Sequence, residues 1–542
     1  MIATTWREAP LWAPVIGFVL LFALIPVALL LGSAWTSGGG AAGFSSAITN
    51  PLNVAAVRNS MVQGGLSAVL AVAIGYPVGI SLGRYHRSAR SVLLALFVVP
   101  FLLPVLIMVQ GVQTVFGGSG VLTGVFPGLT ALGSGLGGIV VVNLLFNVPI
   151  VVLLTAVGVE SAPTNLEPTV ALLGGGPWRR YRDVWGPGSL VGALAGGLVT
   201  FLFSALAFAA PLLLCGASCY TIEARIWALD QELAAPTEAA LLGLLLLLLF
   251  VVPALLYLLT ADRLRRQGQG GRGRERLPSW PRPVGVALGA WTLLVLVAEV
   301  SVAAVVIARS FYPLGVAGPT LDAWRALFSP RVTGALGLPA GGALGNSLLF
   351  AALAALIALL LGILAGYAAR RRRSGSRGLR LVLLVPLIVS PVLLAFALVT
   401  VWGPLLGGSS SVWALIVVSQ AIIALPFAVP TLLISLSPLS ETPREAAEVQ
   451  GLRPFSAFLE VDLPRIRSAL LTACLLAFVI GLGEFTATFF LATPTFTTLP
   501  VALYRLDALR LPLPAAAAAA LLVIVSASAL VAIGLGGRRV EL

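Results

Sequence analysis

Long apolar runs are the feature that most restricts the fold of this chain. Twelve occur, at about 11–33, 60–83, 91–116, 136–158, 190–214, 237–260, 284–308, 346–369, 379–402, 412–436, 468–492 and 512–535. A helix of about 20 apolar residues crosses a hydrocarbon layer of about 30 Å. Because 59% of the residues are hydrophobic and only 10% are charged, a soluble fold of this length has no room to bury them. We therefore expect an all-α integral membrane protein with about 12 transmembrane helices in a lipid bilayer.

The positive charges are distributed along the chain in a way that predicts its orientation. The net charge is +13, and all 33 basic residues are arginine. They gather in alternate loops, at 84–90, 179–182, 263–282, 370–380, 444–467 and 538–539. This is the bias that places basic loops in the cytoplasm, so we expect both termini to be cytoplasmic. The same distribution argues against nucleic acid as a partner.

The two halves of the sequence look like copies of each other. Asn59-Ser60 near the start of the second run matches Asn346-Ser347 near the start of the eighth. Pairs of prolines, glycines and phenylalanines recur at a constant offset of 277 residues: Pro149 and Pro426, Gly174 and Gly451, Pro187 and Pro464, Phe208 and Phe485. We expect a first transmembrane domain at 1–261, a cytoplasmic linker rich in Arg, Gly and Pro at 262–283, and a second transmembrane domain at 284–542. Two parallel repeats of about six helices predict a pathway at their interface.

A polar loop in the second half has the pattern of two short helices joined by a turn. Thr442-Pro443-Arg444-Glu445 is a capping-box pattern, and Gly451 suits the left-handed end of a helix. Pro454 can begin a second helix, which offers Phe455 and Phe458 to a partner. Leu463-Pro464 is expected to stop that helix before the next span.

The first half contains a weaker version of the same loop. Thr164-Asn165-Leu166-Glu167 is again a capping-box pattern, Gly174 and Pro177 again separate two short helices, and Trp178 replaces Phe455. Glu167 lies seven residues before its glycine, whereas Glu445 lies six residues before Gly451.

The second-half loop resembles the permease subunits of binding-protein-dependent ABC importers. Its Glu445-Ala446-Ala447, its Gly451 and its Val461-Asp462-Leu463-Pro464 follow the hallmark of that family. The fused pair of domains is similar to the ferric-iron and thiamine permeases. The resemblance implies a type I ABC importer permease fold in the bacterial inner membrane, two copies of an ABC ATPase subunit docked on the loops, and an extracytoplasmic solute-binding protein. The implied coupling residues are Glu167, Gly174, Pro177, Trp178, Pro187, Glu445, Ala446, Ala447, Gly451, Pro454, Phe455 and Pro464.

Several chemistries are not expected of this chain. A Walker A loop needs a lysine, and the sequence has none, so ATP is expected to be used by the partner subunit and not by this chain. His86 is the only histidine, and we expect no metal, no cofactor and no catalytic residue. The alternative function is a twelve-span secondary transporter without an ATPase partner. That class predicts an acidic and basic signature between the second and third spans, where residues 83–87 contain no Asp.

Polar residues inside the apolar runs are candidates for the pathway because a buried charge in lipid is costly. Glu484 is expected in the outer part of the eleventh span, beside the pathway or holding two helices together. Asn143, Asn147 and Gln420 either line the pathway or bond neighbouring helices. The pair Cys215 and Cys219 is compatible with a disulfide or with two small packed residues. Among solutes, ferric iron or thiamine is expected by resemblance, with polyamine, sulfate and molybdate open.

Overall fold

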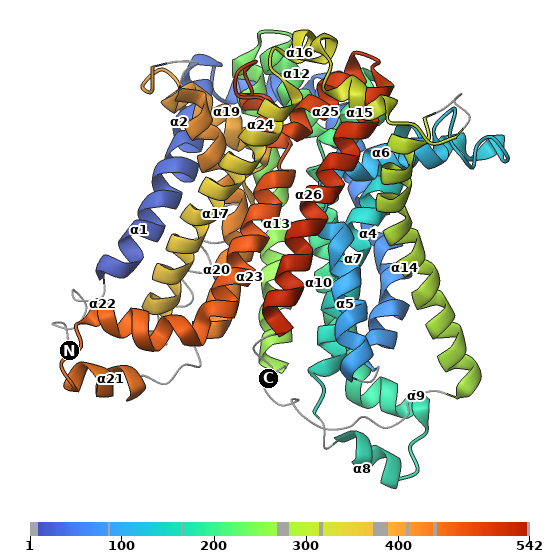
Figure 1. Ribbon diagram of the computed structural model, residues 1–542, viewed down its shortest axis with the longest axis vertical. Coiled ribbons are helices and arrows are strands. Elements are labelled where there is room, and N and C mark those ends of the chain that lie inside the picture. Colours follow the sequence, from blue (N-terminus) through green and yellow to red (C-terminus); the bar gives the residue numbers. More distant parts are fainter. Residues whose placement is uncertain are drawn as a thin grey trace. The chain divides into compact units, whose positions relative to one another are not determined.

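The computed structural model describes residues 9–84, 87–163, 166–267, 281–313, 318–371, 388–407, 411–436 and 442–538. Within these ranges the regular structure is helical throughout (Figure 1). Ten of the helical segments are long and apolar enough to cross a membrane, which confirms the predicted all-α membrane fold.

The ten segments match ten of the predicted apolar runs. They are α1 (Ala9–Val19) with η1 (Leu20–Leu24) and α2 (Ile25–Ser37), α4 (Pro51–Gly83), α7 (Gly135–Glu160), α9 (Pro177–Arg180) with η3 (Tyr181–Trp185) and α10 (Gly186–Ala205), α13 (Pro236–Gln267), α14 (Arg282–Phe311), α17 (Ala340–Arg371), α20 (Val412–Leu436), η7 (Phe458–Asp462) with α23 (Leu463–Gly483), and α26 (Pro512–Arg538).

Two of the twelve predicted runs differ from a simple span. The run at 91–116 is broken into α5 (Arg87–Leu102) and α6 (Val105–Phe116), which are bent by 91°. Pro104 caps the start of α6 with an extended backbone, and it lacks the N–H that would bond to the preceding turn, so the helical hydrogen bonds are interrupted there. The run at 379–402 begins outside the described residues, and its described end is the short helix α19 (Pro391–Trp402). The described residues therefore contain ten spans, or eleven if the bent pair crosses the membrane as one.

The chain forms two compact units whose boundaries differ from those of the sequence copies. Unit 1 contains Met1–Ser33 and Arg325–Leu542, and unit 2 contains Ala34–Trp324. In unit 1, α1 packs along α17, and Nε1 of Trp402 donates to the backbone oxygen of Leu21 at 3.2 Å. In unit 2, α14 packs on α4, α5 and α6. Each unit thus contains the first span of the other sequence half.

Glycines set the close packing at the centre of unit 2. Helices α4, α7 and α10 pack against one another, and α4 and α10 each carry a glycine at every fourth position along the side that faces α7. These are Gly75, Gly79 and Gly83 on α4, and Gly188, Gly192 and Gly196 on α10. A methyl group built on Gly192 would lie 2.1 Å from the backbone oxygen of Leu154. Small residues at this spacing let backbones approach closely in a membrane.

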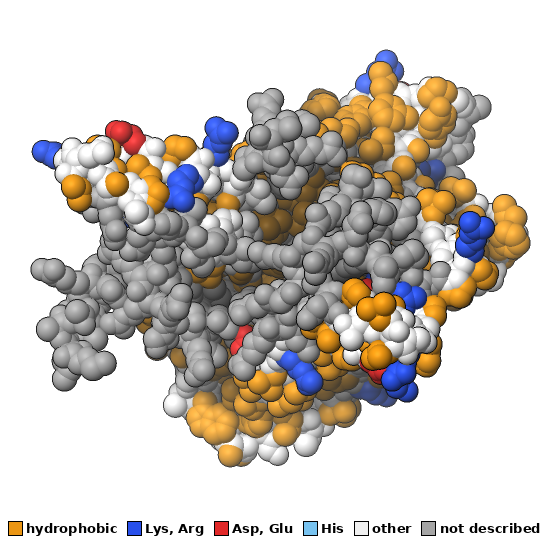
Figure 2. All heavy atoms as spheres, turned by 90° about the horizontal axis from the view of Figure 1, so that it is seen from below, with side chains coloured by type: hydrophobic (Ala, Val, Ile, Leu, Met, Phe, Trp, Pro, Cys, Tyr) orange, Lys and Arg blue, Asp and Glu red, His pale blue; other side chains and the backbone are white. Residues whose placement is uncertain are grey.

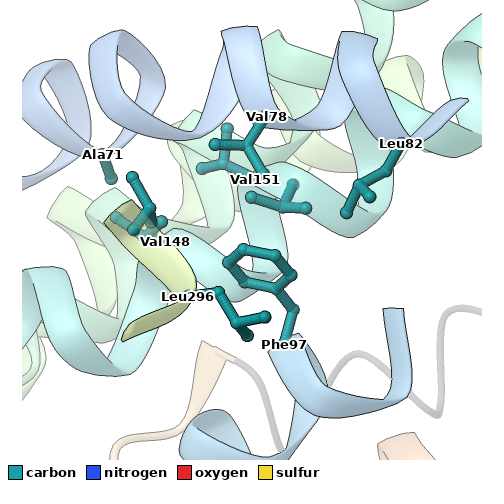
Figure 3. Packing of buried hydrophobic residues seen from close by; sticks show 9 residues of the cluster. Ala71, Val78, Leu82, Phe97, Val148, Val151 and Leu296 are labelled. Atoms are coloured by element: carbon teal, nitrogen blue, oxygen red, sulfur yellow. The ribbon is translucent and has the colours of Figure 1, made fainter. Parts of the chain in front are cut away.

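Apolar side chains fill the space on the other side of α4 and α7. Phe97 from α5 points its ring toward Val151 of α7 and Leu296 of α14 (Figure 3). Val78 and Leu82 of α4 complete this side of the cluster. The seventh span is therefore part of the core of unit 2 and not a loosely attached helix.

A pair of hydrogen bonds fixes one end of unit 2, opposite α8 (Leu166–Leu172) and α9 (Figure 1). Asn59 donates from Nδ2 to the backbone oxygen of Tyr220 at 3.2 Å, and Oγ of Ser60 accepts from the backbone N–H of Ile222 at 2.9 Å. Ile222 is the first residue of α12 (Ile222–Gln231). Cys215 and Cys219, just before this helix, are joined in a disulfide with Cα atoms 5.6 Å apart.

The matching residues make the same contacts in unit 1. Asn346 donates to the backbone oxygens of Thr495 and Thr497, at 3.0 and 3.1 Å. Oγ of Ser347 accepts from the backbone N–H of Leu499, the first residue of α25 (Leu499–Ala508), at 2.7 Å. The Asn-Ser pairs lie inside α4 and α17, two turns after each helix begins, and each one anchors the start of a later helix.

Candidate functional site

The first-half loop folds into two short helices as the sequence predicts. Helix α8 ends at Leu172, and Gly174 follows in the left-handed region with a φ of +75°. The backbone N–H of Gly175 donates to the oxygen of Val170 at 2.8 Å, which closes the helix end. Pro177 then begins α9.

The second-half loop has the same backbone. Helix α21 (Thr442–Val449) is followed by Gly451 with a φ of +95°, and the N–H of Leu452 donates to the oxygen of Ala447 at 3.1 Å. Pro454 begins α22 (Pro454–Ala457). The side chains of Glu445, Pro454 and Phe455 lie outside the described part of the structure. Ala446 is exposed on α21.

Pro464, which was expected to stop the second helix of its loop, does not stop it, and Pro187 in the first loop behaves in the same way. In the first loop α9 continues through the π-helical turn η3 into α10, with Pro187 in the first turn of α10. In the second loop α22 continues through η7 into α23, with Pro464 in the same position. A π-turn re-pairs the carbonyls next to a residue without an N–H, so the backbone bends and stays helical. Each loop is therefore joined by continuous helix to a span.

Apolar side chains project from the ends of the first helices. Leu172, two residues before Gly174, is 88% exposed, and Val449, two residues before Gly451, is also 88% exposed. Leu173 and Trp178 are exposed in the first loop as well. Figure 2 shows the end of unit 2 that carries α8 and α9, where arginine side chains stand among apolar ones. Contiguous exposed apolar groups of this kind mark interaction surfaces.

Glu167 points inward, away from this exposed surface. Arg84, which follows the last residue of α4, donates to both carboxylate oxygens of Glu167, at 2.9 and 2.5 Å. Nη1 of Arg180 lies 3.9 Å from Oε1 of the same carboxylate. The Arg84 guanidinium stands 5.0 Å from the ring centre of Trp185, which is fully buried. The Arg84 and Glu167 side chains are only 6% and 9% exposed, so this is a buried ion pair.

The second loop has a buried charged cluster at the corresponding place. Nη1 of Arg444 on α21 lies 3.5 Å from Oδ2 of Asp462, whose side chain is fully buried. Tyr367 on α17 donates its hydroxyl to the same oxygen at 2.5 Å. The Arg444 guanidinium stands 5.6 Å from the ring centre of Tyr367, and Phe458 packs edge-on against that ring at 5.9 Å. Phe458 therefore packs toward α17 and is half-buried, and its availability to a partner stays a prediction.

Glu484 lies at a break between helices and not within a continuous span. Helix α23 ends at Gly483, and α24 (Thr486–Leu491) begins after Phe485. The Glu484 carboxylate accepts from the backbone N–H of Ala487 and Thr488, both at 2.8 Å, and from the Thr488 hydroxyl at 2.6 Å. It thereby caps the start of α24, where negative charge is favourable.

The buried amides bond to neighbouring helices inside each unit. Asn143 on α7 donates to Oε1 of Gln63 at 2.6 Å and to Oγ of Ser67 at 3.1 Å, both on α4. Asn147 donates to Oγ of Ser204 on α10 at 3.3 Å. In unit 1, Gln420 on α20 donates to the Thr488 hydroxyl at 3.2 Å. These contacts agree with the interpretation that the three amides bond neighbouring helices. Whether they also line the pathway stays a prediction.

Four residues of the buried clusters are not predicted by the sequence patterns. Arg84 belongs only to a basic loop in those patterns, and Trp185 and Tyr367 carry no signal of their own. Asp462 occupies the variable position of the Val461-Asp462-Leu463-Pro464 motif. The charge of Asp462 within an otherwise apolar motif is the sequence signal that could have indicated a buried ion pair.

Two helical units, each with a polar helix–turn–helix loop joined to a span, are the features of a transport permease. Comparison with known families agrees with this class. Residues 75–266 and 358–541 match the family described as binding-protein-dependent transport system inner membrane component. The matches cover more than half of the chain, one in each half, and the chain belongs to this family. It is a transport subunit, the transmembrane permease of an ABC importer, and the alternative of a secondary transporter is not favoured.

Two thiamine permeases align with most of the chain, and a molybdenum permease aligns with about half of it. The thiamine transport system permease protein ThiP of Brucella abortus (strain 2308) is 27% identical over 531 residues, which are 92% of this chain and 91% of that protein. ThiP of Escherichia coli (strain K12) is 25% identical, with 83% of this chain and 82% of that protein covered. A probable molybdenum ABC transporter permease protein of Haloferax volcanii is 28% identical over 47% of this chain and 92% of its own length.

Proposed function

We propose that α8–α9 and α21–α22 are the docking sites for two copies of a separate ABC ATPase subunit, and that an extracytoplasmic binding protein delivers the solute. In this proposal the loops and both termini are cytoplasmic, as the arginine distribution predicts. The chain binds no cofactor and hydrolyses no ATP, and the partner subunit uses the ATP.

One observation carries the docking proposal. The two loops present an apolar side chain, Leu172 or Val449, at the same position before a left-handed glycine, and both side chains are 88% exposed. An apolar side chain that a turn holds out toward solvent indicates a contact surface for a partner. Its occurrence in both sequence halves fits a partner that is itself present twice.

The connection from each loop to the membrane supports a mechanical role. The helix runs without a break from Pro177 through η3 to Ala205, and from Pro454 through η7 to Gly483. A displacement of either loop by the ATPase therefore acts directly on α10 or α23. We propose that this movement shifts the equilibrium between conformations open to opposite sides of the membrane.

Thiamine is the solute that the relatives favour. Thiamine permeases align with most of this chain, at 92% and 83% of its length. A spermidine/putrescine permease of Haemophilus influenzae aligns with only 35% of the chain, and the molybdenum permease with 47%. Uptake of labelled thiamine by cells that depend on this chain tests the proposal, with ferric iron as the alternative solute. Iron uptake without thiamine uptake would contradict it.

Docking is tested by co-purification of the ATPase with the full-length permease. We expect Leu172→Asp and Val449→Asp each to weaken ATPase binding about tenfold, because each places a charge in an apolar contact. The double variant should lose the ATPase altogether. Val125→Asp is the matched control, since Val125 is 68% exposed but lies in the connection between α6 and α7. Full retention of the ATPase by the double variant would contradict the docking proposal.

A further inference from the structure

The charged clusters behind the two loops contain the same three parts in different places. Each has one arginine, one carboxylate bound to it, and one aromatic ring beneath the guanidinium. In unit 2 the carboxylate of Glu167 is on the loop and the arginine follows the end of α4. Trp185 is the last residue of η3, directly before α10. In unit 1 the arginine, Arg444, is on the loop, and the ring of Tyr367 is on α17.

The parts occupy equivalent positions of the sequence repeat. Glu167 and Arg444 are separated by the repeat offset of 277 residues, as are Trp185 and Asp462. The charge on the loop helix is therefore reversed between the halves. The carboxylate of unit 1, Asp462, stands where unit 2 has the ring of Trp185, and the ring of unit 1 is supplied by Tyr367 on α17. Glu167 is the counterpart of Arg444 and not a displaced copy of Glu445, which explains why it lies one residue out of register.

We propose that these clusters are latches that lock each coupling loop to a span of its own unit, α8 to α4 and α21 to α17, so that loop movement is transmitted to those spans. We define the first latch as Arg84, Glu167 and Trp185, and the second latch as Arg444, Asp462 and Tyr367. The inference rests on the docking of ATPases at the loops, and it concerns what happens after docking. These residues are positioning residues and touch neither solute nor ATP.

The geometry gives the latches the properties that transmission requires. The two hydrogen bonds from Arg84 to Glu167 fix the orientation of the guanidinium as well as its distance. The ring of Trp185 adds a contact that favours the cation. Both side chains are buried, so separating the pair would give up two charge-assisted hydrogen bonds away from water, and the pair resists opening when the loop is pushed. In the second latch Asp462 is held by Tyr367 and Arg444 together, which ties three segments at one oxygen.

The reversed polarity makes the two loops non-interchangeable. An arginine at position 167 would face Arg84 and also Arg180, which lies 3.9 Å from the Glu167 carboxylate. A glutamate at position 444 would face Asp462. The loops therefore present similar apolar tips to the ATPases while each fits only its own unit.

The test measures the ratio of solute transported to ATP hydrolysed by the full-length permease with its ATPase and binding protein in proteoliposomes. We expect Glu167→Gln and Asp462→Asn to retain the bound ATPase but to lower this ratio about tenfold, in the range of typical coupling energies. Arg84→Gln combined with Glu167→Gln should lower the ratio no further than either change alone, because both remove the same link.

Controls separate transmission from folding. Asp183→Asn removes an exposed pairing with Arg182 in the same loop and should leave the ratio unchanged. Tyr367→Phe keeps the ring and removes only the hydroxyl donor, so it should lower the ratio without loss of folded protein in thermal unfolding. Tyr367→Phe therefore still tests the second latch if Asp462→Asn fails to fold.

The outcomes distinguish the two proposals. A wild-type ratio in Glu167→Gln and Tyr367→Phe, with the ATPase still bound, would overturn the latch and leave docking intact. Loss of ATPase binding in these variants would also overturn it, since the clusters would then shape the docking surface itself. Failure of the wild-type chain to bind any ATPase would instead overturn the docking proposal.

Discussion

At the scale of single residues, the glycines of unit 2 show how closely its spans are packed. A methyl group on Gly192 would overlap the backbone of α7, while one on Gly65 of α4 would meet nothing within 4 Å. The same substitution therefore has opposite consequences at two positions within the membrane. Glycine is required at the first position by contact and is tolerated at the second.

We predict that Gly192→Ala lowers the free energy of unfolding by about 1–3 kcal/mol, because α7 and α10 must move apart. Gly65→Ala should leave stability unchanged or raise it by up to about 1 kcal/mol through its effect on helix propensity. Thermal unfolding of the purified chain in detergent checks both. Equal effects of the two substitutions would show that the close crossing is absent.

The Asn-Ser pairs provide a second prediction at this scale. Ser60→Ala and Ser347→Ala should each lower the free energy of unfolding by about 1 kcal/mol, because each leaves a buried backbone N–H without its acceptor. Ser301→Ala is the control, since its hydroxyl bonds only within its own helix, to the oxygen of Ala298. A control variant as unstable as the other two would contradict this account of the pairs.

At the scale of elements, Glu484 has a defined task at the start of α24. We predict that Glu484→Ala raises hydrogen exchange of the Ala487 and Thr488 amides about fivefold, because a typical capping interaction is lost. Exchange measured by mass spectrometry on peptides covering 486–491 checks this. If Glu484→Gln abolishes uptake while exchange stays unchanged, the carboxylate acts on the solute pathway instead of on α24.

The elements also show what the sequence can predict and what it cannot. The two helix–turn–helix loops follow from local chemistry, since Gly174 and Gly451 supply left-handed residues and Pro177 and Pro454 begin helices. The break at Glu484 was missed because the residues on both sides are equally apolar, and hydropathy responds to lipid and not to helix direction. The ion pair of Arg84 and Glu167 was missed because it joins residues 83 positions apart in the chain.

At the scale of the whole molecule, each unit incorporates a span encoded in the other half of the sequence. The first span packs on α17 in unit 1, and α14 packs on α4, α5 and α6 in unit 2. A chain divided within the predicted linker would therefore yield two fragments, and each fragment would carry a span that belongs to the compact unit of the other.

We predict that fragments 1–273 and 274–542, expressed together, co-purify through their exchanged spans. Removing residues 1–36 from the first fragment should weaken co-purification, because the contacts of α1 with α17 and of Leu21 with Trp402 are lost. Affinity purification with a tag on the second fragment measures this. Undiminished recovery of the shortened fragment would show that the first span contributes nothing to the association.

The exchange of spans also sets the order in which the protein can be completed on the ribosome. The first span ends at Ser37, but its packing partner α17 begins only at Ala340. At about 5–20 residues per second, roughly 15–60 s of synthesis separate the two. During that interval the first span lies in the bilayer without α17, its packing partner. Unit 2 likewise stays incomplete until α14 has been synthesised. A chain released early would hold an orphan helix, so an incomplete product is exposed to membrane proteases until the second half has been made.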